Sequence, residues 1–265
     1  MRDNLAPSVS LDFLDGYLFR LLQEIAAQEG LEKSGLLNYY GSRIANRIGG
    51  LIEYEEGLAR YLLNEYPGYR VVHAGMGVGT LACALACNGM TVAGVEAYGE
   101  RVRSARRLRS ALVEVWPEVA DRYQIVEGSY PQALMGIPKA GWRPWRRSSP
   151  ANPWLDVNAI LVFTNVVSTW SDETQAAIFD SMPRFGEVIL DLRLFGIQRD
   201  DDTERLALFD RIAESARSAE RLPGLSSGSH FARFMFGSVA AVFSAAASAA
   251  LDLVTVAGDL LVVMA

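Results

Sequence analysis

Three glycines at alternate positions, Gly75, Gly77 and Gly79, follow the apolar run "YRVVHA" and precede a helix rich in small residues. Glycine permits backbone conformations that are closed to other residues, and it lets a ligand approach the main chain closely. The first turn of the helix that follows carries N–H groups without partners inside the helix. The pattern therefore predicts a strand-to-helix loop that binds a cofactor of the nucleotide type.

Two kinds of cofactor are compatible with this loop. A dinucleotide fold uses the pattern G-x-G-x-x-G/A, with an acid about 20 residues further on. Gly77, Gly79 and Ala82 satisfy that pattern, but Gly75 is then left without a role. The alternative pattern, G-x-G-x-G, uses all three glycines. A nicotinamide-dependent oxidoreductase therefore stays open beside the second interpretation.

The elements around the loop alternate between short apolar runs and helices. Runs typical of strands cover residues 69–75, 90–98, 123–129, 159–166 and 187–195, and helical patterns cover 79–88 and 99–115. Such alternation is typical of a parallel sheet with helices on both faces. The last residues, 253–265, are expected to form a hairpin around a Gly-Asp turn. We therefore expect a doubly wound, mostly parallel seven-stranded α/β sheet of the Rossmann-like kind that ends in an antiparallel hairpin.

The chain of 265 residues is expected to form one α/β domain with additions. Residues 1–66 carry apolar stripes at helical spacing and are interpreted as an N-terminal helical cap, and residues 67–265 as the cofactor-binding domain. Two irregular stretches, 138–154 and 197–229, are interpreted as insertions between core elements. The apolar stretch 234–251 is rich in alanine and serine, which favours a buried helix over a membrane span.

The glycine loop and the strands beside it resemble the motifs of class I S-adenosylmethionine-dependent methyltransferases. The resemblance covers about three quarters of the chain, from Tyr69 to the C-terminus. The run "VVHAGMGVGTLACALA" is similar to their first motif, "VAGVEAY" to their second and "IVEGSYPQAL" to their third. The expected antiparallel end of the sheet is a further point of likeness. The resemblance implies methyl transfer from S-adenosylmethionine to a small-molecule acceptor.

The resemblance also implies which residues hold the cofactor. The glycine loop would pass beneath its methionine and ribose parts, and Glu96 would accept hydrogen bonds from both ribose hydroxyls. The full set of expected cofactor-binding residues is His73, Gly75, Met76, Gly77, Gly79, Glu96, Ala97, Gly128, Ser129 and Thr164.

Two positions depart from the pattern of this family. His73 stands where most members have Asp or Glu near the ammonium group of the cofactor, and Ser129 stands where Asp commonly contacts the adenine amino group. A neutral imidazole can accept a hydrogen bond from an ammonium group, whereas a protonated one would repel it. A core histidine without a cofactor contact, and a methyltransferase-like domain that has lost activity, therefore stay open as alternatives.

The acceptor site is expected at the carboxyl ends of the parallel strands, where ligands of such sheets bind. Asn165 and His230 are the candidate catalytic residues: Asn165 would orient the nucleophile and His230 would act as a base. We expect both to approach one cavity together with Tyr39 and Tyr40 from the cap, and we expect residues 197–229 to form a lid. The alternatives are a helix-capping asparagine, a surface histidine and tyrosines that only pack the cap.

Charge and composition limit the partners. The net charge is −6, and the arginines between 101 and 109 are typical of a solvated helix face, which argues against nucleic acid and anionic membranes as partners. Cys83 and Cys87 are expected to be reduced and buried, and no ligand spacing predicts a metal. Acidic residues near the N-terminus interrupt any secretory signal, so a cytoplasmic location is expected, and homo-oligomer formation is left open.

Overall fold

The structure is a computed structural model that describes most of the chain. The described residues are 9–46, 49–135, 154, 159–164, 171–192, 202–222, 225 and 231–236. Among them no helix is both long and apolar enough to cross a bilayer.

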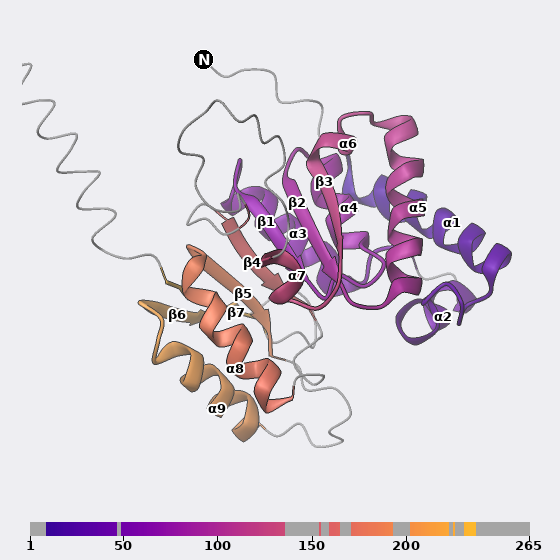
Figure 1. Cartoon of the computed structure of the whole chain (residues 1–265). Coiled ribbons are helices and arrows are strands. Elements are labelled where there is room, and N and C mark those ends of the chain that lie inside the picture. The colour runs from indigo at the N-terminus through magenta and orange to yellow at the C-terminus, as the bar shows by residue number, and fades with distance from the viewer. Residues whose placement is uncertain are drawn as a thin grey trace, which may run out of the picture.

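The described strands form one mixed, seven-stranded sheet in the order β3-β2-β1-β4-β5-β7-β6 (Figure 1). Its strands are β1 (Arg70–Ala74), β2 (Thr91–Glu96), β3 (Tyr123–Glu127), β4 (Ala159–Phe163), β5 (Glu187–Asp191), β6 (Ser218–Arg221) and β7 (Phe231–Met235). Strands β1 to β5 are parallel to one another, and β7 lies antiparallel between β5 and β6. The predicted Rossmann-like sheet with an antiparallel end is confirmed.

Each face of the sheet carries its own apolar cluster, because successive side chains of a strand point to opposite faces. Val71 of β1 belongs to one cluster and its neighbour Val72 to the other. All five residues of β4 are buried, as expected for a central strand that is covered on both sides. The apolar runs that predicted β1, β2 and β4 thus have a direct physical cause.

Six helices cover one face of the sheet and three cover the other (Figure 1), counted within the described residues. The first group is α1 (Leu11–Glu29), α2 (Leu37–Asn46), α3 (Glu53–Glu65), α4 (Thr80–Cys87), α5 (Gly99–Val115) and α6 (Val119–Arg122). The second group is α7 (Gln132–Met135), α8 (Asp172–Ser181) and α9 (Asp202–Ala213), with a short 3₁₀ helix, Met182–Arg184, after α8.

The N-terminal helices α1, α2 and α3 belong to the same core as the sheet. Leu14, Leu18 and Leu22 of α1 are fully buried, as are Leu58 and Leu62 of α3, and all five lie in the cluster that also contains α4 and α5. The apolar stripes that predicted these helices are therefore confirmed as buried faces. The cap packs on the sheet through α4 and α5 and does not form a separate core.

Residues 197–229, predicted as an insertion between core elements, contribute a helix and a strand to the fold, and their role as a lid stays a prediction. They contain α9 and β6, and β6 pairs with β7 at the edge of the sheet. Three of the four residues of β6 are exposed, so its polar sequence "SAER" resembled a loop. The stretch 234–251, predicted as a helix, begins inside strand β7. The antiparallel hairpin is thus formed by β6 and β7, whereas the predicted hairpin at 253–265 lies outside the described residues, as does the proposed insertion 138–154 except for Trp154.

Candidate functional site

The glycine loop connects β1 to α4 at the carboxyl edge of the sheet. Gly75, Gly77 and Gly79 have φ angles of +71°, +63° and +82°, a region that side chains disfavour. The backbone N–H groups of Gly75 and Met76 both donate to the carbonyl of Val95, at 2.9 and 3.1 Å, which ties the loop to β2. All three glycines of the G-x-G-x-G pattern are therefore required by the backbone.

The glycines differ in what a side chain would meet. A Cβ added to Gly77 would have no heavy atom within 4 Å outside its chain neighbours, so this glycine faces open space. A Cβ on Gly79 would lie 2.1 Å from the hydroxyl of Tyr123. Met76 turns its side chain into the core, where its sulfur accepts a hydrogen bond from Tyr123 at 3.1 Å. A cofactor contact by Met76 would therefore involve its backbone.

Glu96 is the last residue of β2 and points back at the loop. Its side chain is 3% exposed, Oε2 accepts from the Gly77 N–H at 2.9 Å and Oε1 accepts from the Tyr98 N–H at 3.0 Å. Arg101 Nη1 lies 4.0 Å from Oε1. A carboxylate has about four lone-pair sites. Glu96 can therefore hold the loop and still accept hydrogen bonds from a ligand.

The segments that follow β2 and β3 lie along the same carboxyl edge of the sheet as the glycine loop. Ala97 and Tyr98 are exposed, and the Arg101 guanidinium lies 4.7 Å from the centre of the Tyr98 ring. The Gly128 N–H donates to the carbonyl of Glu96 at 2.8 Å, which places the turn after β3 beside the end of β2. Ser129 comes next and is exposed.

The buried side chains of His73, in β1, and Thr164, directly after β4, contact each other at the carboxyl edge of the sheet. His73 Nε2 lies 2.8 Å from Thr164 Oγ1, and Nδ1 has no hydrogen-bond partner among the described residues. Burial lowers the pKa of His73 to about 4, because the interior disfavours the charged imidazolium. The histidine is therefore neutral at physiological pH.

The structure thus brings the expected cofactor residues together along the carboxyl ends of β1 to β4. The two candidate catalytic residues, Asn165 and His230, lie outside the described residues, as does the side chain of Tyr39. Tyr40 is described and buried, and its hydroxyl lies 2.9 Å from Thr80 Oγ1 at the start of α4. The proposed common cavity of these four residues therefore stays a prediction.

One buried carboxyl group near the loop was missed from the sequence. Glu55 of α3 is 3% exposed and accepts a hydrogen bond from Thr80, the residue directly after Gly79. It stands in the polar run "EYEEG", where no spacing distinguishes this buried glutamate from the partly exposed Glu56 beside it.

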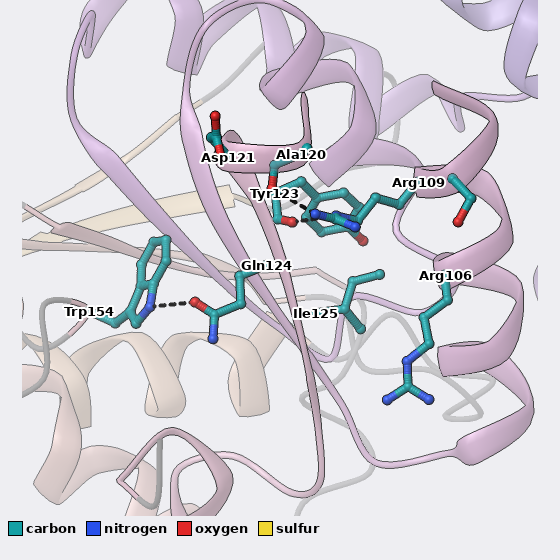
Figure 2. Close-up of a pocket in the computed structure, with 9 residues that line it drawn as sticks. Arg106, Arg109, Ala120, Asp121, Tyr123, Gln124, Ile125 and Trp154 are labelled. Atoms are coloured by element: carbon teal, nitrogen blue, oxygen red, sulfur yellow. Dashed lines mark hydrogen bonds between the residues drawn. The ribbon is translucent and has the colours of Figure 1, made fainter. Parts of the chain in front are cut away.

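A pocket of about 660 Å³ lies elsewhere, between the start of β3 and helices α5 and α6 (Figure 2). Figure 2 shows Trp154 donating to Gln124 Oε1, at 3.1 Å, and Arg109 turned toward the backbone of β3. Arg109 donates to the carbonyls of Tyr123 and Ala120, at 2.7 and 2.6 Å. Arg106, the second arginine of this pocket, donates to Glu127 at 2.9 Å. Because both arginines already bind the protein and because the pocket lies at the start of β3, we place the candidate site at the carboxyl edge.

The described part of the chain contains no candidate metal site. No group of three or more His, Cys, Asp or Glu side chains gathers there in a way that could hold an ion. Cys83 and Cys87 are buried and form no disulfide, and burial raises the pKa of Cys87 to about 12. Both cysteines therefore behave as small core residues.

Comparisons with known proteins found matches by structure and none by sequence. A scan of protein-family models and a search of curated proteins found no match. Among solved structures, the methyltransferase domain of bacterial CtHen1 shares 15% identity, with 71% of this chain and 100% of that chain covered and a TM-score of 0.48.

Two further solved structures are also similar to this chain. A protein of Methanococcus maripaludis, provisionally described as an S-adenosyl-L-methionine-dependent methyltransferase, shares 16% identity over 90% of this chain and 98% of that chain, with a TM-score of 0.48. The precorrin-6y C5,15-methyltransferase of Geobacter metallireducens shares 11% identity over 68% and 87%, with a TM-score of 0.42. The strand order and connections of this chain are what define its fold, and they agree with the fold implied by the class I methyltransferase motifs.

Proposed function

We propose that the carboxyl edge of the sheet binds S-adenosylmethionine and that the protein transfers its methyl group to a small-molecule acceptor. The observation that carries this proposal is the contact between Glu96 and the glycine loop. A buried carboxylate at the end of β2 accepts from Gly77, and the space in front of Gly77 is open. A ligand can therefore touch the loop backbone and this carboxylate at the same time.

The residues present suit the chemical groups of this cofactor. The remaining lone pairs of Glu96 would accept from the two ribose hydroxyls. The turn at Gly128 and Ser129, together with exposed Tyr98, offers a border for the adenine. When bound, the cofactor supplies an intrinsically reactive sulfonium methyl group. The contribution of the protein is then to hold cofactor and acceptor in line and to exclude water.

His73 would serve in its neutral form. If Nε2–H donates to Thr164, Nδ1 is left as an acceptor that faces no described partner. Such an atom can accept a hydrogen bond from an ammonium group, either directly or through an ordered water. The low pKa of about 4 keeps the ring uncharged, so it does not repel the cofactor at neutral pH.

The backbone favours this cofactor over a dinucleotide. In the dinucleotide pattern Gly75 would have no role, yet its φ of +71° makes glycine as necessary there as at Gly77 and Gly79. A nicotinamide-dependent oxidoreductase and a domain without activity are the alternatives that an experiment has to exclude.

A ligand screen by thermal unfolding tests the proposal. S-adenosylmethionine and S-adenosylhomocysteine should raise the unfolding temperature of the wild-type protein, and NAD and NADP should not. Glu96→Ala should abolish the increase, because it removes two charge-assisted hydrogen bonds worth roughly 1.5–3 kcal/mol each. Glu114→Ala, at an exposed position on α5, is the matched control and should respond like wild type. A response to NAD alone would favour the oxidoreductase.

A further inference from the structure

A buried carboxylate joins the N-terminal helices to the start of the glycine-loop helix. Both oxygens of Glu55, from α3, lie 2.9 Å from Thr80 Oγ1, and Oε2 also accepts from the Ile52 N–H at 3.0 Å. Thr80 is the first residue of α4, directly after Gly79. The last turn of the cofactor loop is therefore held by a side chain from a different part of the chain.

Helix α2 takes part in the same network through Tyr40. The Tyr40 hydroxyl lies 2.9 Å from Thr80 Oγ1, and both groups are buried. Thr80 has one hydroxyl hydrogen, so when it donates to an ionised Glu55 its oxygen can accept the hydrogen of Tyr40. The hydrogen bonds then run in one direction, from Tyr40 through Thr80 to Glu55.

The surroundings of Glu55 disfavour its charge. The pKa of Glu55 is raised to about 7. Burial is the largest cause and the negative charge of Asp15 on α1 adds to it, whereas the hydrogen bonds from Ile52 and Thr80 and the positive charge of Arg43 on α2 act in the opposite direction. Among the described residues, Tyr54 and Cys83 are further titratable groups beside this network. A glutamine would have the same shape without the cost of a buried charge, so an ionisable group here points to a role beyond packing.

We propose that Glu55 is a positioning residue of the cofactor site, which acts through Thr80 to fix the first turn of α4 and with it the glycine loop. The inference rests on the proposed function, because it assumes that the loop holds the cofactor. The contacts place α2 and α3 in direct connection with that loop, so the N-terminal helices contribute to cofactor affinity without touching the cofactor.

The network predicts a direction for the effect of pH. An ionised Glu55 accepts from both Thr80 and Ile52. A protonated carboxyl group carries a hydrogen that competes with the one from Thr80, so the bond to α4 reverses or is lost. Affinity for the cofactor should therefore rise as pH rises from 6 to 8. His73 stays neutral over this range, because its pKa is about 4.

Calorimetric titration with S-adenosylhomocysteine at pH 6, 7 and 8 tests this inference. If only the ionised form binds, wild-type affinity should rise about tenfold between pH 6 and 8, since the competent fraction rises by that factor for a pKa of about 7. Glu55→Gln should remove this dependence. Thr80→Val should remove it as well, and Thr80→Ser, which keeps the hydroxyl, should retain it.

The matched control is Glu56→Gln, at the neighbouring position of α3, where the side chain is exposed and paired with Arg60. It should keep the wild-type profile. Titration of the ligand itself is the same for every variant and cancels in the comparison. If Glu55→Gln did not fold, Thr80→Val against Thr80→Ser would decide the matter.

The outcomes separate this inference from the proposed function. Equal pH profiles for wild type and Glu55→Gln, with binding intact and abolished by Glu96→Ala, would overturn the role of Glu55 alone. Absence of binding by the wild-type protein at every pH would overturn the proposed function, and the positioning role with it.

Discussion

Gly77 and Gly79 show how neighbouring glycines of one loop can be required for different reasons. Both have positive φ angles, but Gly79 packs against buried Tyr123 whereas Gly77 borders open space. The backbone requires both glycines, and under the proposed function the ligand requires Gly77 as well. Glu96 contacts this loop directly, because its carboxylate accepts a hydrogen bond from the Gly77 backbone.

This difference predicts different outcomes for two alanine variants. Gly79→Ala should lower the free energy of unfolding by about 3 kcal/mol, since it adds strain at positive φ to a clash with the Tyr123 hydroxyl. Gly77→Ala should cost only about 1–2 kcal/mol, from strain at positive φ. Its methyl group should nevertheless block the cofactor. Urea unfolding and calorimetry would check both variants, and cofactor binding by Gly77→Ala at wild-type strength would contradict the site.

At the scale of elements, the sequence was informative wherever burial imposed a pattern. Strands β1, β2 and β4 are covered on both faces, so their apolar runs were visible, and the glycines marked the loop after β1. The edge strand β6 is mostly exposed and carries polar residues, so its sequence does not distinguish it from part of an insertion. Such a strand forms because it pairs with β7, which follows later in the chain, and its own sequence carries little signal.

The candidate site likewise contains residues that the sequence predicts and one that it does not. Backbone requirements predicted Gly75, Gly77 and Gly79, and the resemblance to the methyltransferase motifs predicted Glu96. Glu55 could not be predicted, because its burial results from the packing of α3 against α4, and its local sequence does not distinguish it from the other glutamates of α3. Contacts between distant segments leave no periodic signal in either of them.

For the whole molecule, two buried groups make opposite contributions to the pH dependence of stability. The folded-state pKa of His73 is lowered to about 4, so its contribution is present above the unfolded value of 6.5 and is lost as pH falls. The folded-state pKa of Glu55 is raised to about 7, so its contribution is full below about 4.5 and is lost as pH rises. Between pH 5 and 7.5 the two largely cancel.

Substitution of each group alone should reveal its contribution to the pH dependence of stability. Relative to wild type, Glu55→Gln should gain about 2 kcal/mol of stability between pH 5 and 7.5, and His73→Gln should lose about 2 kcal/mol over the same range. Urea unfolding at both pH values measures the differences, and broad titration of surface carboxylates cancels between variant and wild type. A shift of the same sign in both variants would show that one of the two groups is not buried as described.

The central claim is that the carboxyl edge of the sheet is the cofactor site. A crystal structure with S-adenosylhomocysteine tests it most directly. The ligand should lie over the loop from Gly75 to Gly79, with its ribose hydroxyls within hydrogen-bond distance of Glu96. A ligand bound instead in the pocket between β3 and α5, beside Trp154 and Arg109, with the loop empty, would contradict it.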